Sequence, residues 1–292
     1  MKKNISWVCI MISVLSFSIF TNVKSGRTDH GHGHEGEVAG QILDVTFYSP
    51  DGISLAGTLT YPEGEGPFHC VVLAGGTLSN TRDGDVANER APKRDALKRL
   101  SHELVEAGYA TFRFDKRGYG QSSKNDLEIS YRDQANDLQA AILYARHRTN
   151  ILSVIVAGES AGAYLACMAA KEGLLANGYL FLGGLASSSP EMYAHNFGRL
   201  KQWAEQSDEN MAWAKQNAFH DLRTGYGYEA MFQAAREGKE SFTFSLDGKE
   251  WVMSLERKRE ELQNEPGELF RFITKPVLAI QGEMDMNVPP GD

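Results

Sequence analysis

Cysteine is scarce in this sequence of 292 residues, which contains only three. Cys9 lies in the apolar N-terminal segment, Cys70 in a predicted strand and Cys167 in a predicted helix. Small exported proteins that depend on disulfides for stability are much richer in cysteine. No disulfide framework is therefore indicated, and we expect Cys70 and Cys167 to be buried free thiols because apolar residues flank both.

Long hydrophobic runs are also missing after residue 25. Two lysines precede an apolar stretch over residues 5–20, and residues 23–25 form a small-x-small pattern typical of a cleavage site. The apolar stretch is shorter than the ~20 residues that cross a bilayer. Residues 1–25 are therefore predicted to be a secretory signal peptide, with an uncleaved anchor as the alternative, and the protein is predicted to be secreted or periplasmic.

Basic residues are outnumbered by acidic ones. The whole chain has a net charge of −8, and removal of residues 1–25 leaves 27 Lys and Arg against 38 Asp and Glu, a net charge of −11. Nucleic acids and anionic membrane surfaces attract basic proteins instead. We therefore expect no nucleic-acid partner and no stable membrane association after signal cleavage.

Residues 26–40 are rich in His and Gly, and three histidines alternate with glycine in the stretch "HGHGH". Such a tract is a weak metal-binding pattern. A solvated linker agrees better with the composition, because no cysteine or fixed scaffold accompanies the histidines. We therefore expect a linker over residues 26–40, and neither a metal nor an organic cofactor.

Beyond residue 40, strand-like runs alternate with amphipathic helices. Two runs flank the turn Ser49-Pro50-Asp51-Gly52 and predict an antiparallel hairpin. Ser130 and Asp133 form a capping-box pattern at the start of one helix. Further strands are predicted at 69–75, 109–115, 151–158, 178–186 and 275–282, and another helix at 91–108. This alternation predicts an α/β fold with a mostly parallel sheet that helices cover on both faces.

Residues 191–272 differ from the rest in being rich in Trp, Met and charged side chains. We interpret them as mainly helical, except for "SFTFSLDGKEWVMS", in which aromatic residues around Asp247-Gly248 predict a small hairpin. An excursion of this length between two strands predicts a cap inserted into a core made of residues 41–190 and 273–292. Substrate preference is expected to depend on this cap.

The stretch Gly-Glu-Ser-Ala-Gly, residues 158–162, joins an apolar strand to a helix of small residues. A turn this sharp brings strand and helix so close that only Gly and Ala fit beside the serine. Ser160 is then held in a strained conformation with its hydroxyl exposed, and the helix N-terminus offers the Ala161 N–H to a developing oxyanion. Ser160 is therefore predicted to be a nucleophile that attacks an acyl carbonyl. The sequence assigns no role to Glu159.

Together with three further segments, this stretch resembles the α/β-hydrolase superfamily, in its serine esterase and serine aminopeptidase-like branch. The segments are VVLAGGTLSNTRDGD, YATFRFDKRGYGQSS and PVLAIQGEMDMNVPP, which begin at residues 71, 109 and 276. The resemblance covers about residues 42–190 and 273–292 and leaves out the cap. It implies an oxyanion hole formed by the Thr77 and Ala161 N–H groups and Asp285 as the acid of a catalytic triad. Leu78 is the alternative to Thr77, because Gly-Gly-Thr replaces the His-Gly-x of many relatives.

No histidine follows Asp285 in this sequence, although the triad of this superfamily runs serine, acid, histidine along the chain. His195 and His220, in the cap region, are the two histidines that could approach a pocket. Neither is expected to be the base, because a base must reach both Ser160 and Asp285. We therefore expect the chain to be an inactive fragment that stops before the last strand, the last helix and the triad histidine.

The resemblance implies an exported serine hydrolase that cleaves carboxylic esters or small peptide or amide bonds through an acyl-enzyme on Ser160. The alternative is a catalytically inactive binding protein of the same fold, and a thioesterase or transferase would also keep the fold. The expected partner is a small-molecule ester or peptide substrate, and the oligomeric state is left open. The charged loop residues are expected to form ion pairs that fix the loops, namely Arg82, Asp83, Asp115 and Arg117.

Overall fold

The computed structural model describes residues 40–87, 91–123, 128–174, 176–217, 227–246, 249–285 and 287–292. The predicted signal peptide, almost all of the linker, His220 and the turn Asp247-Gly248 lie outside these residues. The described residues form two compact units. The larger unit comprises residues 40–186, 266–283 and 291–292, and the smaller unit comprises residues 187–265 and 284–290. Within the described residues, we find no helix with the length and apolar character needed to span a membrane.

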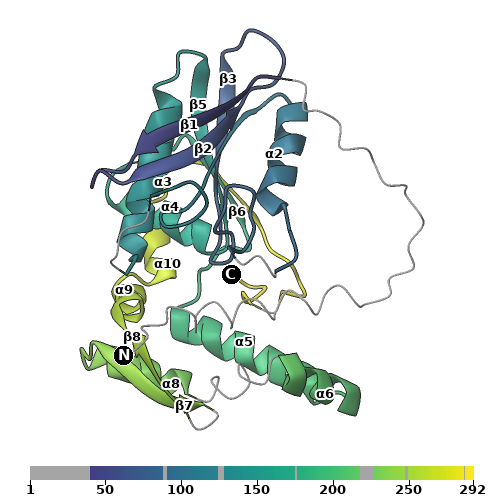
Figure 1. Ribbon diagram of the computed structural model, residues 1–292, viewed down its shortest axis with the longest axis vertical. Coiled ribbons are helices and arrows are strands. Elements are labelled where there is room, and N and C mark those ends of the chain that lie inside the picture. Colours follow the sequence, from purple (N-terminus) through teal and green to yellow (C-terminus); the bar gives the residue numbers. More distant parts are fainter. Residues whose placement is uncertain are drawn as a thin grey trace. The chain divides into compact units, whose positions relative to one another are not determined.

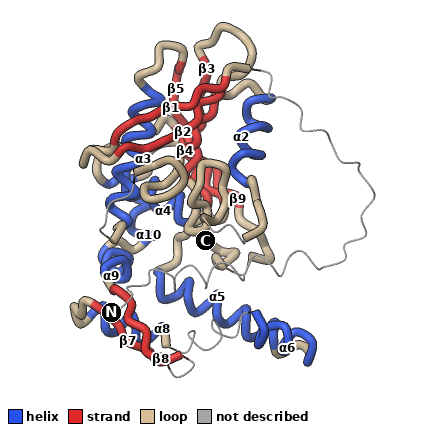
Figure 2. The backbone as a smooth tube through the Cα atoms, viewed as in Figure 1, coloured by secondary structure: helices blue, strands red, loops and turns tan. Residues whose placement is uncertain are grey.

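The described strands of the larger unit form a seven-stranded sheet with the order β1-β2-β4-β3-β5-β6-β9 (Figures 1 and 2). β1 pairs antiparallel with β2 and β2 antiparallel with β4, whereas β4, β3, β5, β6 and β9 pair in parallel. The sheet is therefore mostly parallel, as predicted. The bounds are β1 Ile42–Tyr48, β2 Ser54–Thr60, β3 Phe68–Ala74, β4 Ala110–Phe114, β5 Ile151–Glu159, β6 Gly178–Leu182 and β9 Val277–Ile280.

The predicted opening hairpin is confirmed by the pairing of β1 with β2. Its turn is closed by a hydrogen bond of 2.9 Å from the Gly52 N–H to the Ser49 carbonyl oxygen. Gly52 has a φ of +84°, which a glycine adopts at little cost. The turn therefore forms as the Pro-Asp-Gly pattern predicts.

Helices cover both faces of the sheet, as Figure 1 shows for α2 on one side and α3 and α4 on the other. Side chains of β3 alternate between the two faces. Val71 and Leu73 pack with Leu97 of α2, whereas Val72 lies in the larger apolar cluster with side chains of α3, α4 and α10. The bounds are α2 Ala96–Glu106, α3 Tyr131–Arg146, α4 Ala161–Lys171 and α10 Pro266–Leu269, with a 3₁₀ turn at Phe270–Phe272.

Four elements are shorter than predicted, among them the strands predicted at 109–115 and 275–282, which comprise Ala110–Phe114 and Val277–Ile280. The helix predicted at 91–108 begins at Ala96, because Asp95 has a left-handed backbone with a φ of +48°, which a right-handed helix cannot include. The Asp85 carboxylate accepts the N–H groups of Arg94 (2.7 Å) and Asp95 (3.0 Å) at this point. The strand predicted at 178–186 ends at Leu182, and the next residue, Gly183, has a φ of +60° that ends the extended backbone.

The predicted capping box of α3 is confirmed. Ser130 Oγ accepts the Asp133 N–H at 3.0 Å, and Asp133 Oδ2 accepts the Ser130 N–H at 3.0 Å. Both cysteines of the described residues are also as predicted, since Cys70 and Cys167 are buried and free. Burial raises the pKa of each thiol to about 12, so both are inert neutral groups at ordinary pH.

The smaller unit is mainly helical and contains the predicted hairpin of β7 with β8. Phe232 and Leu255 are almost completely buried and form its apolar centre. Beside them, the Lys258 ammonium pairs with the Glu261 carboxylate at 2.8 Å and lies 4.7 Å from the centre of the Tyr193 ring. The bounds are α5 Ser189–Ala204, α6 Asp208–Asn217, α8 Tyr228–Arg236, β7 Ser241–Leu246, β8 Lys249–Ser254 and α9 Glu256–Gln263.

Candidate active site

Ser160 lies at the sharp turn between β5 and α4, with φ 50° and ψ −116°. This region is unfavourable for a residue with a Cβ and is found where surrounding structure enforces it. The neighbouring glycines show what enforces it here: a Cβ on Gly158 would lie 2.5 Å from the Ala163 nitrogen, and a Cβ on Gly162 would lie 2.0 Å from the Ala74 carbonyl oxygen. Strand and helix thus approach as closely as the sequence predicts.

Backbone hydrogen bonds fix the position of Ser160. Its N–H donates to the Leu182 carbonyl oxygen of β6 at 2.9 Å, and its carbonyl oxygen accepts the Ala163 N–H at 2.9 Å. The first N–H groups of a helix have no acceptor within that helix. Ala161 is the first residue of α4, so its N–H can donate a hydrogen bond to a negatively charged oxygen next to Ser160.

The loop of residues 75–79 lies directly against this turn. A Cβ on Gly76 would be 2.9 Å from the Glu159 carbonyl oxygen and 3.1 Å from Ser160 Cβ. Thr77, the next residue, is exposed, and Leu78 is half-buried. The structure therefore brings Ser160, Ala161 and the Thr77 loop together. It leaves both Thr77 and Leu78 as candidates for the second oxyanion donor.

The predicted ion pairs hold the chain that follows this loop. Arg82 makes a 2.8 Å ion pair with Asp115, which also accepts the Arg82 N–H at 2.7 Å. The Asp83 carboxylate forms a second ion pair, with Arg113 of β4. The Lys116 ammonium donates to the Gly76 carbonyl oxygen. The ion pairs expected for Arg82, Asp83 and Asp115 are therefore present.

Glu159 is a residue of this site that sequence analysis missed. Its Oε2 accepts the Gly76 N–H at 3.2 Å and the Ser79 hydroxyl, and its Oε1 lies 2.9 Å from Arg94 Nη2. The signal in the sequence is an acidic residue at the end of a buried strand, directly before the candidate nucleophile. At the end of β5, this residue lies next to the loop that follows the paired strand β3, which is the loop of Thr77.

Asp285 belongs to the smaller unit. Its Oδ1 accepts the N–H groups of Asn287 (2.8 Å) and Val288 (3.1 Å), and its carbonyl oxygen lies 3.2 Å from His195 Nε2. No pattern in the sequence indicates the contact between His195 and Asp285. The role of Asp285 as the triad acid for Ser160 stays a prediction.

The histidines described in the larger unit do not contact Ser160. His69 is the second residue of β3, and its Nδ1 lies 2.6 Å from Ser153 Oγ. Because β3 and β5 are parallel, this is the end of the sheet opposite Ser160. His102 lies on α2, and His147 ends α3.

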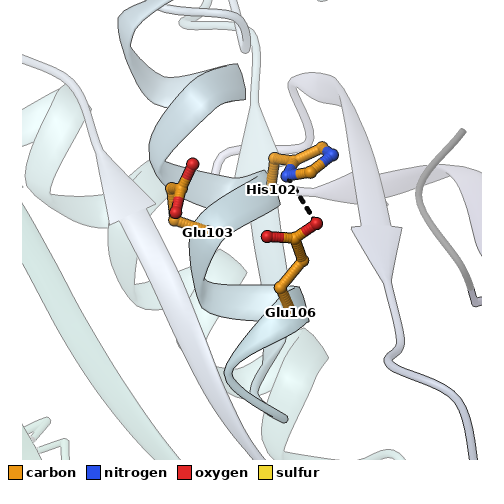
Figure 3. Close-up of side chains that lie close together, drawn as sticks. All are labelled: His102, Glu103 and Glu106. Atoms are coloured by element: carbon orange, nitrogen blue, oxygen red, sulfur yellow. Dashed lines mark ion pairs between the residues drawn. The ribbon is translucent and has the colours of Figure 1, made fainter. Parts of the chain in front are cut away.

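The described residues include one group that could hold a metal ion, formed by His102, Glu103 and Glu106 on α2 (Figure 3). His102 Nδ1 lies 3.6 Å from Glu106 Oε1, and both glutamates are exposed. This spacing is that of an ordinary surface pair on a helix. None of the candidate catalytic residues belongs to the group.

The profile of the family described as serine aminopeptidase, S33, matches residues 93–292. The chain belongs to the S33 serine aminopeptidase family. One curated relative of this S33-family chain is Esterase EstD of Thermotoga maritima, which is 26% identical over 148 residues. The match covers 45% of the chain and 35% of EstD, so the chain spans about a third of the length of that relative.

Solved structures similar to the S33-family chain are α/β hydrolases and esterases. The α/β hydrolase GrgF from Penicillium sp. sh18 matches with a TM-score of 0.54 and 18% identity, over 86% of this chain and 83% of that one. The esterase PF2001 of Pyrococcus furiosus matches with a TM-score of 0.52 and 17% identity, over 89% and 77%. Est1E of Butyrivibrio proteoclasticus matches with 0.52 and 18%, over 84% and 81%. These likenesses establish the α/β-hydrolase fold.

Proposed function

We propose that this protein is an exported serine hydrolase that cleaves carboxylic esters through an acyl-enzyme on Ser160. The observation that carries the proposal is the strained backbone of Ser160, φ 50° and ψ −116°, at the N-terminus of α4. Strain of this kind persists where the surrounding structure enforces it, and it clusters at sites of chemistry. The membership of a hydrolase family supports the same assignment.

In the proposed reaction, Ser160 Oγ attacks the ester carbonyl carbon and gives its proton to a base. The carbonyl oxygen becomes an oxyanion that accepts the N–H of Ala161 and that of Thr77 or Leu78. Each such donor contributes about 3 kcal/mol to lowering the barrier. Collapse of the intermediate expels the alcohol, which takes the proton from the base, and water then releases the acid from Ser160 by the same two steps.

The base is a histidine in the proposal, and the Asp285 carboxylate orients it and stabilises its charged form. His195 is the described histidine that contacts Asp285, through the carbonyl oxygen rather than the carboxylate. We therefore do not assign His195 as the base. A His195→Ala variant is the check, since loss of activity comparable to that of Ser160→Ala would give this residue the role.

Esters are proposed ahead of peptides because the curated relative and the Pyrococcus furiosus structure are both named esterases. The family itself is named for an aminopeptidase, so amide substrates are the second candidate. Export is proposed from the basic start and apolar run of residues 1–25. N-terminal sequencing of the protein recovered outside the cytoplasm checks this, and an intact Met1 would contradict cleavage.

The test compares Ser160→Ala with wild type, produced from the complete reading frame, in hydrolysis of p-nitrophenyl acetate and of an aminoacyl p-nitroanilide. We expect Ser160→Ala to lose nearly all ester hydrolysis and all labelling by a fluorophosphonate, with unchanged melting temperature. Ser153→Ala is the matched control, because Ser153 lies on the same strand near its other end. Unchanged turnover by Ser160→Ala would overturn the proposal, and a wild type that neither turns over nor labels would favour a binding protein.

A further inference from the structure

We infer that Glu159 is a positioning residue that holds the oxyanion loop against Ser160. This inference rests on the proposed function and adds to it a specific device. The Glu159 backbone continues into the nucleophile, while its side chain reaches the loop that carries Thr77 and Leu78. One residue thus joins the two parts of the site whose spacing determines how well an oxyanion is bound.

The contacts of the Glu159 carboxylate all point to this loop or to the residue that braces it. Oε2 accepts the Gly76 N–H at 3.2 Å and also the Ser79 hydroxyl. Gly76 and Ser79 are the residues on either side of Thr77 and Leu78. The carboxylate therefore holds both ends of the two-residue segment that presents the candidate N–H donors.

Arg94 holds the carboxylate in turn. Its Nη2 lies 2.9 Å from Glu159 Oε1, and the side chains of Arg94 and Glu159 are 15% and 24% exposed. A hydrogen bond between charged groups that water reaches little is stronger than one on the surface. The Arg94 backbone is itself fixed, because its N–H donates to Asp85 Oδ1 at 2.7 Å and its carbonyl oxygen accepts Arg99 Nη2 at 2.8 Å.

The loop needs such a support because no helix or strand ladder holds it. Residues 75–80 are described as turn and coil, between the end of β3 and the ion-paired segment after it. An oxyanion donor works only when its N–H lies about 2.7–3.1 Å from the oxyanion. A loop that shifts by about 1 Å loses much of this contribution. Removing the Glu159 charge should therefore reduce transition-state binding more than substrate binding.

The experiment measures kcat and KM for p-nitrophenyl acetate in Glu159→Gln, Arg94→Gln and Ser79→Ala, each produced from the complete reading frame. Inhibition by phenylboronic acid, whose tetrahedral adduct imitates the oxyanion, is measured in parallel. Glu172→Gln is the matched control, because Glu172 is an exposed glutamate at the other end of α4. It should behave as wild type in every assay.

We expect Glu159→Gln to lower kcat by about 10- to 100-fold with KM changed by less than threefold. The inhibition constant of phenylboronic acid should rise by about the same factor as kcat/KM falls. Ser79→Ala should lower kcat by a smaller factor. In the double variant Glu159→Gln with Ser79→Ala, the fold-loss in kcat should be smaller than the product of the two single fold-losses, because both changes release the same loop. Arg94→Gln should resemble Glu159→Gln.

Two outcomes would overturn the inference. In the first, Ser79→Ala and Arg94→Gln both keep the wild-type kcat, and Glu159→Gln either retains its activity or fails to fold. The other is a rise in KM alone, which would assign Glu159 to substrate binding. Failure of the proposed function looks different, since Ser160→Ala would then retain its turnover. Loss of turnover in Ser160→Ala together with either of the two outcomes above would keep Ser160 as the nucleophile and refute the positioning role of Glu159.

Discussion

Gly162 and Ala74 are in direct contact across the turn that holds Ser160, so closely that a Cβ on Gly162 would lie 2.0 Å from the Ala74 carbonyl oxygen. Ala74 is the last residue of β3, and Gly162 is the second residue of α4. The helix can therefore begin beside the sheet only if position 162 has no side chain. The exposed turn at Ser160 depends on this contact, because it sets how close α4 comes to β3.

Replacing Gly162 by Ala should destabilise the protein even though alanine favours a helix by about 1 kcal/mol. The methyl group would overlap a backbone oxygen, and overpacking of this kind costs about 3 kcal/mol. We expect a lower urea midpoint and loss of ester hydrolysis. Gly198→Ala in α5 is the control, since nothing lies within 4 Å of a Cβ there, and it should be neutral or stabilising. Equal stability of both variants would contradict the steric argument.

Asp137→Asn should destabilise the larger unit strongly. Arg117 is almost completely buried, and Asp137 pairs with it through two bonds of 2.6 and 2.7 Å. Removing one charge of a buried pair costs about 3 kcal/mol, because the other charge stays buried without full compensation. Urea denaturation measures the loss. Glu106→Gln removes the acid of an exposed pair on α2 and should change stability by less than about 0.5 kcal/mol, so a similar loss in both variants would refute the distinction.

Asp85→Asn should weaken the protein in a way that depends on pH. Burial raises the pKa of the Asp85 carboxyl, but hydrogen bonds from the Asp95 and Arg94 N–H groups and the Lys93 ammonium outweigh it and leave the pKa below its usual value. Because the folded pKa is lowered, the carboxylate stabilises the fold above the usual pKa of about 4 and loses this effect as the pH falls through the folded value. We expect wild type to be about 2 kcal/mol more stable than Asp85→Asn at pH 7.

The measurement is urea unfolding of wild type and Asp85→Asn between pH 7 and pH 3. The difference in unfolding free energy should be constant from pH 7 to about pH 5 and should shrink below about pH 4. A difference that grows on acidification would show that the pKa of Asp85 is raised in the folded protein. That result would also argue against a role of the Asp85 carboxylate in fixing the Arg94 backbone.

Local patterns were sufficient for most of the fold. The Pro-Asp-Gly turn predicted the opening hairpin, Ser130 and Asp133 predicted the start of α3, and the aromatic alternation in residues 241–254 predicted the hairpin of the smaller unit. Each of these signals acts between residues close in the sequence. Boundaries were less accurate, as at α2, which begins at Ala96 after the left-handed backbone of Asp95.

The sequence by itself determined the mostly parallel sheet, the buried thiols and the serine at a turn lined by small residues, because these depend on periodicity, flanking residues and glycine positions. Only the tertiary structure decided the surroundings of that serine. The Glu159 carboxylate meets Gly76 and Ser79 because parallel strands β3 and β5 end at the same edge of the sheet, and His195 meets Asp285 across 90 residues of chain. Contacts of this kind arise from the packing of elements, which no local pattern encodes.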